Sequence, residues 1–191
     1  MKMSPEQAFE IFRRTGVMHE GHFKLTSGRH SDRYMQCARL FERPDDSAAV
    51  CSDVAGAFLG QNIDLVAGPA IGGIIMAYEV ARILSVRNVF AERENGTMAL
   101  RRGFEVEAGN RALVVEDVVT TGGSVKEVIE LLRGRGVEVV GVGAVVDRSN
   151  GTVDFGVPFH AVTTMNVESW EAEGCPLCRK GLPIIKPGSR K

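Results

Sequence analysis

Short apolar runs alternate with helical patterns through the middle of the chain, and this alternation restricts the fold more than any other feature. The runs are rich in Val, Ala and Leu and cover residues 65–67, 88–91, 112–115 and 137–146. Amphipathic helical patterns precede the first run, follow it up to Leu84, and recur over residues 125–132. Strands and helices in this order are joined by right-handed crossovers. The sequence therefore predicts an α/β fold with a mostly parallel sheet flanked by helices.

The two ends of the chain do not follow this alternation. A helix is expected over residues 5–14 with Ser4 as its cap, and turn residues 27–29 precede a predicted strand at 34–37. We expect one domain spanning residues 1–191, with a core of about residues 44–167. The first 43 or so residues and the C-terminal tail would form a small hood on this core.

Composition limits the possible partners. Acidic residues number 24 and basic residues 23, so no overall charge attracts the chain to nucleic acid or to an anionic membrane. A phosphate site must therefore be local. No apolar run reaches the roughly 18 residues of a membrane span, and the first 16 residues lack the apolar stretch of a secretory signal. We expect a cytoplasmic protein whose four cysteines are reduced thiols rather than a disulfide framework.

The strongest chemical signal lies at residues 113–124, where an apolar strand leads to Glu116 and Asp117 and then to a Thr/Gly/Ser turn that opens a helix. Glycines and free N–H groups at a helix start bind phosphate without net basic charge. The acid pair suits ribose hydroxyls, the water shell of a metal or a developing positive charge. The alternative is a helix-capping loop beside a solvated strand end. A Walker loop fits poorly because no Lys follows the glycines, and no G-x-G-x-x-G motif follows the first strands.

A C-x-x-C pair stands near the C-terminus. Cys175 and Cys178 look like half of a zinc knuckle, but a structural zinc site needs four ligands and the chain has no second C-x-x-C or H-x-x-H pair. The four histidines show no metal-ligand spacing. Two subunits supplying one pair each is an alternative, and the simpler prediction is a pair of thiols without partners.

Several segments resemble one enzyme family. Residues 114–124 resemble the phosphoribosyl-pyrophosphate signature of type I phosphoribosyltransferases. Residues 23–34 are similar to the N-terminal motif of the orotate phosphoribosyltransferases, residues 91–104 resemble the mobile loop in one branch of that family, and Arg148 stands where the family places its orotate arginine. The resemblance covers nearly the whole chain. It implies transfer of the 5-phosphoribosyl group from phosphoribosyl pyrophosphate to orotate, giving orotidine 5′-monophosphate for pyrimidine biosynthesis.

The resemblance also implies a role for each matching residue. The donor, phosphoribosyl pyrophosphate, would be bound by Glu116, Asp117, Val118, Val119, Thr120, Thr121, Gly122, Gly123 and Ser124, and by the pyrophosphate loop residues Ala70, Ile71 and Gly72. Orotate would contact Thr120, Arg148, Ser27, Gly28, Tyr34 and Met35. The catalytic residues would be Asp117, Arg93, Arg101 and Arg102. The arginines would reach pyrophosphate across a homodimer, and Mg²⁺ would be held mainly by the substrate.

This chain departs from the family pattern in three places. Many relatives carry Lys at the positions of Thr26 and of residues 71–73, and their mobile loop contains Lys and His where this chain has arginines. Without the resemblance, Arg101 and Arg102 would be read as a solvated turn, and Arg148 as a surface pair with Asp147 that contributes about 0–1 kcal/mol.

Two alternative functions remain open. A purine base as acceptor is disfavoured because a neutral purine has no carboxylate to pair with Arg148. A regulator that senses phosphoribosyl pyrophosphate without chemistry would need a nucleic-acid-binding surface, which this nearly neutral chain does not suggest.

Overall fold

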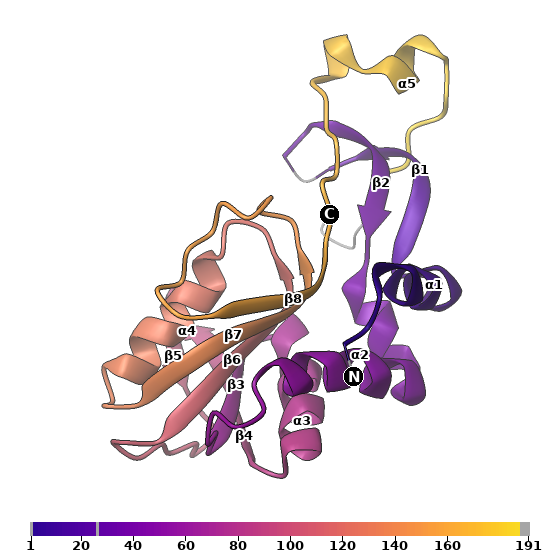
Figure 1. Ribbon diagram of the computed structural model, residues 1–191. Coiled ribbons are helices and arrows are strands. Elements are labelled where there is room, and N and C mark those ends of the chain that lie inside the picture. Colours follow the sequence, from indigo (N-terminus) through magenta and orange to yellow (C-terminus); the bar gives the residue numbers. More distant parts are fainter. Residues whose placement is uncertain (1, 26, 188–191) are drawn as a thin grey trace.

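A six-stranded sheet forms the centre of the molecule (Figure 1). The computed structural model describes residues 2–25 and 27–187. The strand order is β5-β4-β3-β6-β7-β8, and every neighbouring pair is parallel except β4 and β5. The strands are β3 (Leu65–Pro69), β4 (Arg87–Glu94), β5 (Thr97–Leu100), β6 (Arg111–Val119), β7 (Glu138–Asp147) and β8 (Phe159–Thr164). The predicted mostly parallel α/β fold is confirmed, although the sequence did not predict β8.

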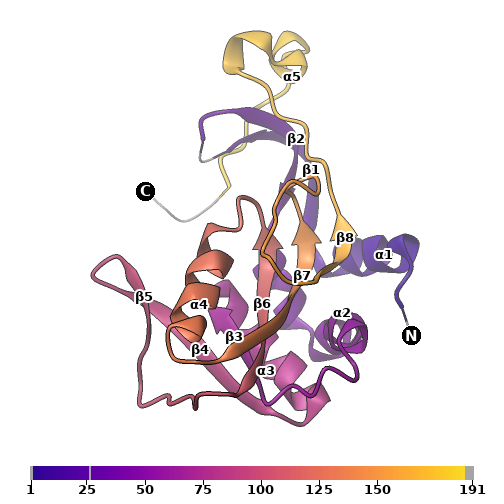
Figure 2. The same ribbon diagram turned by 60° about the vertical axis from the view of Figure 1, so that its left-hand side comes forward.

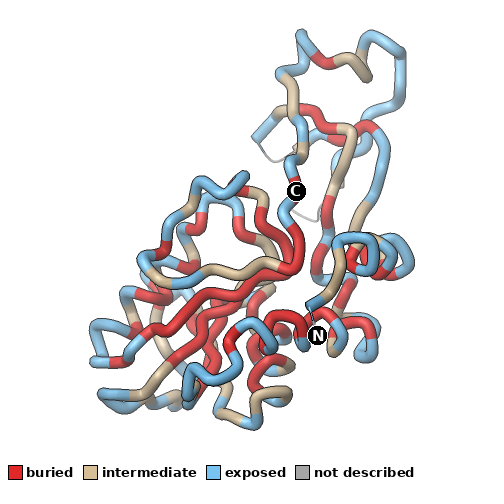
Figure 3. Tube along the Cα trace, viewed as in Figure 1, coloured by how far each residue is buried: buried red, intermediate tan, exposed pale blue. Residues whose placement is uncertain are grey.

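Helices cover both faces of the sheet, so the central strands β3, β6 and β7 are buried along most of their length (Figure 3). The flanking helices are α2 (Pro44–Ala57) and α3 (Gly72–Leu84) on one face and α4 (Gly123–Arg133) on the other. Side chains alternate along each strand. Val66 accordingly packs in the core under α2 and α3, while its neighbours Leu65 and Ala67 pack in the core under α4.

A hood stands beyond the strand ends toward which β6, β7 and β8 point (Figure 2). Its N-terminal part contains α1 (Pro5–Thr15), β1 (Met18–Lys24), β2 (His30–Met35) and the 3₁₀ helix η1 (Cys37–Glu42). Its C-terminal part contains η2 (Ala172–Gly174) and α5 (Pro176–Arg179). Backbone bridges join Phe23 to Ile185 and His30 to Trp170, so the tail lies against the β1–β2 hairpin. The predicted cap at Ser4 is confirmed, and it forms a capping box with Gln7.

No helix in the described ranges is long and apolar enough to cross a membrane.

Phe58, at the C-terminal end of α2, packs directly against Gly141 of β7, which leaves no room for a larger side chain there. A Cβ atom added at Gly141 would lie 2.3 Å from Cε1 of Phe58, whereas one added at Gly56 of α2 meets nothing within 4 Å. Because overpacking a core costs about 1–3 kcal/mol, Gly141→Ala should lower the free energy of unfolding by that amount in a urea titration. Gly56→Ala is the matched control and should be neutral or stabilising by up to about 1 kcal/mol. Equal effects of the two substitutions would contradict the packing argument.

Candidate active site

The loops that follow β3 and β6 lie side by side at one edge of the sheet. The two strands are parallel neighbours, with Ala67 paired to Val114, so their carboxyl ends meet at this edge, where α/β sheets bind ligands. The loop after β3 opens α3, and the loop after β6 opens α4. Two helix N-termini, each with N–H groups that lack an intrahelical acceptor, therefore flank the end of β6.

Glycines let the first loop touch the acid pair. A Cβ atom added at Gly72 would lie 2.6 Å from Oδ2 of Asp117, and one added at Gly68 would lie 2.5 Å from the carbonyl oxygen of Gly73. The loop backbone thus abuts the Asp117 carboxylate, and a side chain at Gly72 would displace it. The peptide bond between Ala70 and Ile71 is cis, and the Ile71 side chain is exposed.

The second loop encloses a small polar cavity of about 70 Å³, which has room for a few waters or one phosphate-sized group. Gly122 begins α4 with a positive φ of 73°, and a Cβ atom there would lie 2.8 Å from Val153. The loop therefore requires glycine for both its conformation and its packing. The structure brings together around this cavity all but Asp117 of the donor-binding residues predicted within 116–124, namely Glu116, Val118, Val119, Thr120, Thr121, Gly122, Gly123 and Ser124.

The two adjacent carboxyl groups share a confined space at the end of β6. Burial, followed by the nearby Asp117 carboxylate, raises the pKa of Glu116 to about 9. Asp117 Oδ1 accepts a hydrogen bond of 2.8 Å from the Val118 N–H group. At neutral pH the free protein therefore holds a proton on this pair. A ligand that brings hydroxyl donors or a cation would compensate the second negative charge.

This raised pKa has a consequence for stability. The unfolded chain releases the Glu116 proton near its ordinary pKa of 4.5, whereas the folded protein keeps it up to about 9. Between these values the unfolded state binds fewer protons, so the free energy of unfolding should fall as pH rises, by at most about 1.4 kcal/mol per pH unit. Glu116→Gln should flatten this slope in urea titrations run across the window. Glu130→Gln, at an exposed position on α4, should leave it unchanged; an identical slope in the Glu116 variant would refute the raised pKa.

Arg148 lies beside the same strand end. It directly follows β7, and its N–H group donates a 2.7 Å hydrogen bond to the carbonyl oxygen of Val119. Its Nε atom is buried without a hydrogen-bond partner in the described part of the chain. Asp147 instead accepts from the Ser149 N–H group at 2.7 Å. A buried, unpartnered guanidinium nitrogen favours an anionic ligand over the surface-pair alternative.

The hood also reaches the site, at the start of η1. Burial and the nearby Asp117 carboxylate raise the pKa of the Cys37 thiol, and Arg148 lowers it. Cys37 therefore lies near both the acid pair and the predicted orotate arginine. The sequence indicated neither Cys37 at this site nor Val153 beside Gly122, because both contacts depend on tertiary structure.

The predicted hood residues occupy three different environments. Ser27 and Gly28 are exposed on the turn between β1 and β2. Tyr34 is half-buried, and its hydroxyl group donates to Oε1 of Gln36 at 2.7 Å. Met35 packs in the core instead of facing an open side, with 9% of its surface exposed. Thr26 lies outside the described residues.

The three predicted loop arginines lie on the β4–β5 hairpin and just beyond it, where the predicted exposed hairpin is found. Within the chain they contact acids other than Glu116 and Asp117. The pairs are Arg93 with Glu127 at 2.7 Å, Arg101 with Glu94 at 3.3 Å and Arg102 with Glu92 at 2.7 Å. The structure does not bring these arginines to the acid pair of their own chain.

The C-x-x-C thiols are unpaired with other cysteines, as predicted, but two histidines to which the sequence assigned no role lie beside them. The β1–β2 hairpin brings His22 and His30 next to Cys175 and Cys178. All four cysteines are free thiols. No sequence pattern indicates this cluster, because its histidines are eight residues apart on two strands and far from the cysteines along the chain.

Fold and site together define a phosphoribosyltransferase. The family model for the phosphoribosyl transferase domain matches residues 45–174. Orotate phosphoribosyltransferase of Caldanaerobacter subterraneus subsp. tengcongensis is 58% identical over 189 residues, covering 99% of this chain and 100% of the relative. That of Pelotomaculum thermopropionicum is 57% identical with the same coverage.

A solved structure agrees with these relatives. The crystal structure of orotate phosphoribosyltransferase from Aeropyrum pernix matches with a TM-score of 0.70 and 29% identity, covering 82% of this chain and 92% of that chain. The chain belongs to the orotate phosphoribosyltransferase family.

Proposed function

We propose that this protein transfers the 5-phosphoribosyl group from phosphoribosyl pyrophosphate to orotate, releasing orotidine 5′-monophosphate and pyrophosphate for de novo pyrimidine (UMP) biosynthesis. The observation that carries the proposal is the position of Glu116 and Asp117 between two anion-binding loops, with the unpartnered Nε of Arg148 at the adjacent strand end. Family membership supports the same activity.

The donor occupies both loops. The cavity after β6 takes the 5′-phosphate through backbone N–H groups and the hydroxyls of Thr120, Thr121 and Ser124. The loop of Ala70, Ile71 and Gly72 takes the pyrophosphate. Glu116 and Asp117, which lie between the loops, accept hydrogen bonds from the two ribose hydroxyls. Binding in this way draws the shared proton from the acid pair, because hydroxyl donors stabilise its ionised form.

The acceptor lies beside Arg148. Orotate is a planar anion, and a guanidinium fork matches its carboxylate or ring oxygens with two parallel hydrogen bonds. Thr120 lines the boundary between donor and acceptor, and the hood residues Ser27, Gly28, Tyr34 and Met35 are assigned to the orotate side on family resemblance.

Transfer is a displacement at the anomeric carbon of the ribose. A ring nitrogen of orotate forms the new C–N bond while the C–O bond to pyrophosphate breaks, and the leaving group takes the bonding electrons. The proton of that nitrogen is released to water. Positive charge develops on the ribose in the transition state, and the Asp117 carboxylate stabilises that charge. The reaction needs no side-chain nucleophile, so positioning and exclusion of water provide the remaining rate enhancement.

Magnesium fits this site. Mg²⁺ prefers oxygen ligands and keeps part of its water shell, and the Asp117 carboxylate lies against Gly72 of the proposed pyrophosphate loop. When bound, the ion neutralises the departing pyrophosphate. The phosphates of the substrate would mainly hold the ion, and Glu116 and Asp117 would contact its waters.

We further propose a cytoplasmic homodimer that acts on small molecules, without nucleic-acid or membrane partners. Ile75 and Tyr78 lie on one face of α3 and are 53% and 60% exposed, and an apolar helix face of this kind suits a subunit interface. In the dimer the hairpin arginines Arg93, Arg101 and Arg102 reach pyrophosphate in the partner's site.

An absorbance assay tests the activity. Orotate loses ultraviolet absorbance when it is converted, and the loss should require the protein, phosphoribosyl pyrophosphate and Mg²⁺ together. Adenine, hypoxanthine, xanthine and uracil run in parallel should give no turnover. Turnover of another base alone would overturn the acceptor assignment, and donor binding without any turnover would favour the regulator alternative.

A further inference from the structure

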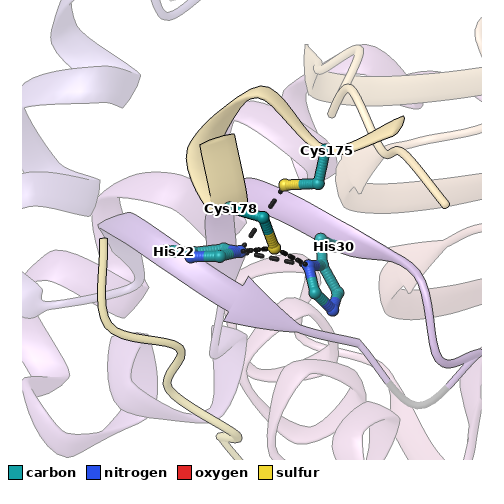
Figure 4. Close-up of side chains that lie close together, drawn as sticks. All are labelled: His22, His30, Cys175 and Cys178. Carbon is teal, nitrogen blue, oxygen red and sulfur yellow. Dashed lines mark hydrogen bonds between the residues drawn. The ribbon is translucent and has the colours of Figure 1, made fainter. Parts of the chain in front are cut away.

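Four side chains that the proposed activity does not use converge in the hood. His22 of β1 and His30 of β2 face Cys175 and Cys178 of the C-terminal segment (Figure 4). Their four candidate ligand atoms all lie within 4.8 Å of one another. Three of the side chains are buried and that of Cys178 is half-buried. We refer to these residues as the Cys2His2 cluster.

Four of the six ligand–ligand distances in the cluster are close to the edges of a tetrahedral zinc site. Zinc bonds of about 2.0–2.1 Å to nitrogen and 2.3 Å to sulfur imply edges of about 3.3 Å between two nitrogens and about 3.6 Å between nitrogen and sulfur. His22 Nε2 lies 3.1 Å from His30 Nδ1, and it lies 3.5 Å and 3.7 Å from the two sulfur atoms. Cys178 Sγ lies 3.2 Å from His30 Nδ1. One ion at the centre therefore needs only small side-chain shifts.

A hydrogen bond outside the cluster orients His22. Its Nδ1 atom lies 2.9 Å from the carbonyl oxygen of Leu182, and a carbonyl can only accept, so Nδ1 carries the proton. The Nε2 lone pair then points into the cluster, as in zinc sites whose histidines donate their other N–H to a backbone carbonyl. His30 Nδ1 and the two sulfur atoms all lie within 3.7 Å of His22 Nε2, although its single lone pair can accept only one good hydrogen bond. A cation satisfies all of them.

The C-terminal segment lacks a core of its own. Among residues 171–187 only Cys175 is buried, and most of this segment is exposed in Figure 3. Its helix α5 has four residues, too few to be stable alone.

A shift of register in β1 between Glu20 and Phe23 lets His22 and Phe23, which are neighbours in sequence, both be buried. This irregularity in the strand directs the histidine toward the C-terminal segment.

We propose that the Cys2His2 cluster binds one Zn²⁺ as a closed structural site that fastens the C-terminal segment to the β1–β2 hairpin. Thiolate and imidazole ligands in tetrahedral arrangement select zinc. Binding displaces one proton from each thiol, and two thiolates with two neutral imidazoles give a site without net charge, which suits its burial. The site is separate from the acid pair, and the inference does not depend on the proposed activity.

Metal content of the purified full chain is the first test. Protein produced with zinc in the medium, without a histidine tag, should contain about one zinc per chain by mass spectrometry of the metal. Cys178→Ser should reduce this to less than about a tenth. Cys51→Ala, at a buried thiol of α2, and His19→Asn, at an exposed histidine of β1, should retain it. A wild-type protein without zinc, or a Cys178 variant with full zinc, would overturn the proposal.

The absorption spectrum of bound Co²⁺ identifies the ligands in wild-type protein, so this test does not depend on whether a variant folds. Wild-type protein stripped of metal and loaded with Co²⁺ should show the visible bands of tetrahedral cobalt and a thiolate-to-cobalt charge-transfer band in the near ultraviolet. Added Zn²⁺ should remove both. Octahedral cobalt spectra, or spectra without the charge-transfer band, would show that the thiols are not ligands.

Limited proteolysis tests the fastening role. Removing the metal from wild-type protein should make trypsin cleave after Arg179 and Lys180 at least about tenfold faster, because cleavage needs local unfolding of the segment. Re-adding Zn²⁺ should restore the slow rate. Equal rates with and without metal would refute a structural role.

Discussion

Arg148→Ala is expected to lower kcat/KM for orotate by about 30- to 4,000-fold. The Nε atom of Arg148 is buried and has no partner in the described part of the chain, so a bound anion would supply the acceptor that this nitrogen lacks. Removing one partner of a buried, hydrogen-bonded charge pair costs about 2–5 kcal/mol, and every 1.4 kcal/mol is tenfold. Steady-state kinetics with orotate as the varied substrate would measure the loss.

The effect should be confined to the acceptor. Affinity for phosphoribosyl pyrophosphate, measured by calorimetry, should stay within about twofold, because the donor loops do not include Arg148. Arg148→Lys should recover only part of the activity, since an ammonium group cannot form the planar fork. Arg82→Ala removes an exposed arginine paired with Glu79 on α3 and should leave the kinetics unchanged. Unaltered orotate kinetics in Arg148→Ala would remove this residue from the acceptor site.

Sequence patterns were sufficient to predict the fold where structure is local. The strands β3, β6 and β7 each contain a continuous apolar run, as expected of parallel strands buried on both faces. β8 escaped prediction because its six residues include His160 and two threonines, and its strand conformation comes from pairing with β7. Local propensity does not contain such information.

The candidate site likewise has one part that the sequence indicates and another that only the tertiary structure brings together. The phosphate loop is contiguous in sequence, so the order of its acids and glycines is enough to indicate its chemistry. The neighbourhood of Arg148 and Cys37 depends on how the hood folds back on the sheet. The Cys2His2 cluster is the extreme case, because Cys175 is separated from His22 by 153 residues and meets it only through tertiary structure.

Asp117→Asn is expected to reduce kcat by about 100- to 1,000-fold while leaving the fold intact. The carboxylate is held between the Gly72 backbone and the phosphate loop, where positive charge develops on the ribose as pyrophosphate leaves. An amide of the same shape keeps the packing and removes the charge, and loss of one preorganised electrostatic contact of this kind costs about 2.7–4 kcal/mol of transition-state stabilisation. Single-turnover kinetics would separate the chemical step from product release.

Donor binding distinguishes this role from a merely structural one. Asp117→Asn should bind phosphoribosyl pyrophosphate within about tenfold of wild type, because most donor contacts come from the two loops. It should also unfold at a urea midpoint no lower than wild type, since the amide keeps the packing and removes the carboxylate that disfavours ionisation of Glu116. Asp45→Asn, at an exposed position in the first turn of α2, controls for the loss of one negative charge and should not alter kcat. A variant that binds the donor and turns over at the wild-type rate would exclude Asp117 from the stabilisation of the transition state, and Glu116 would then be the carboxylate to test.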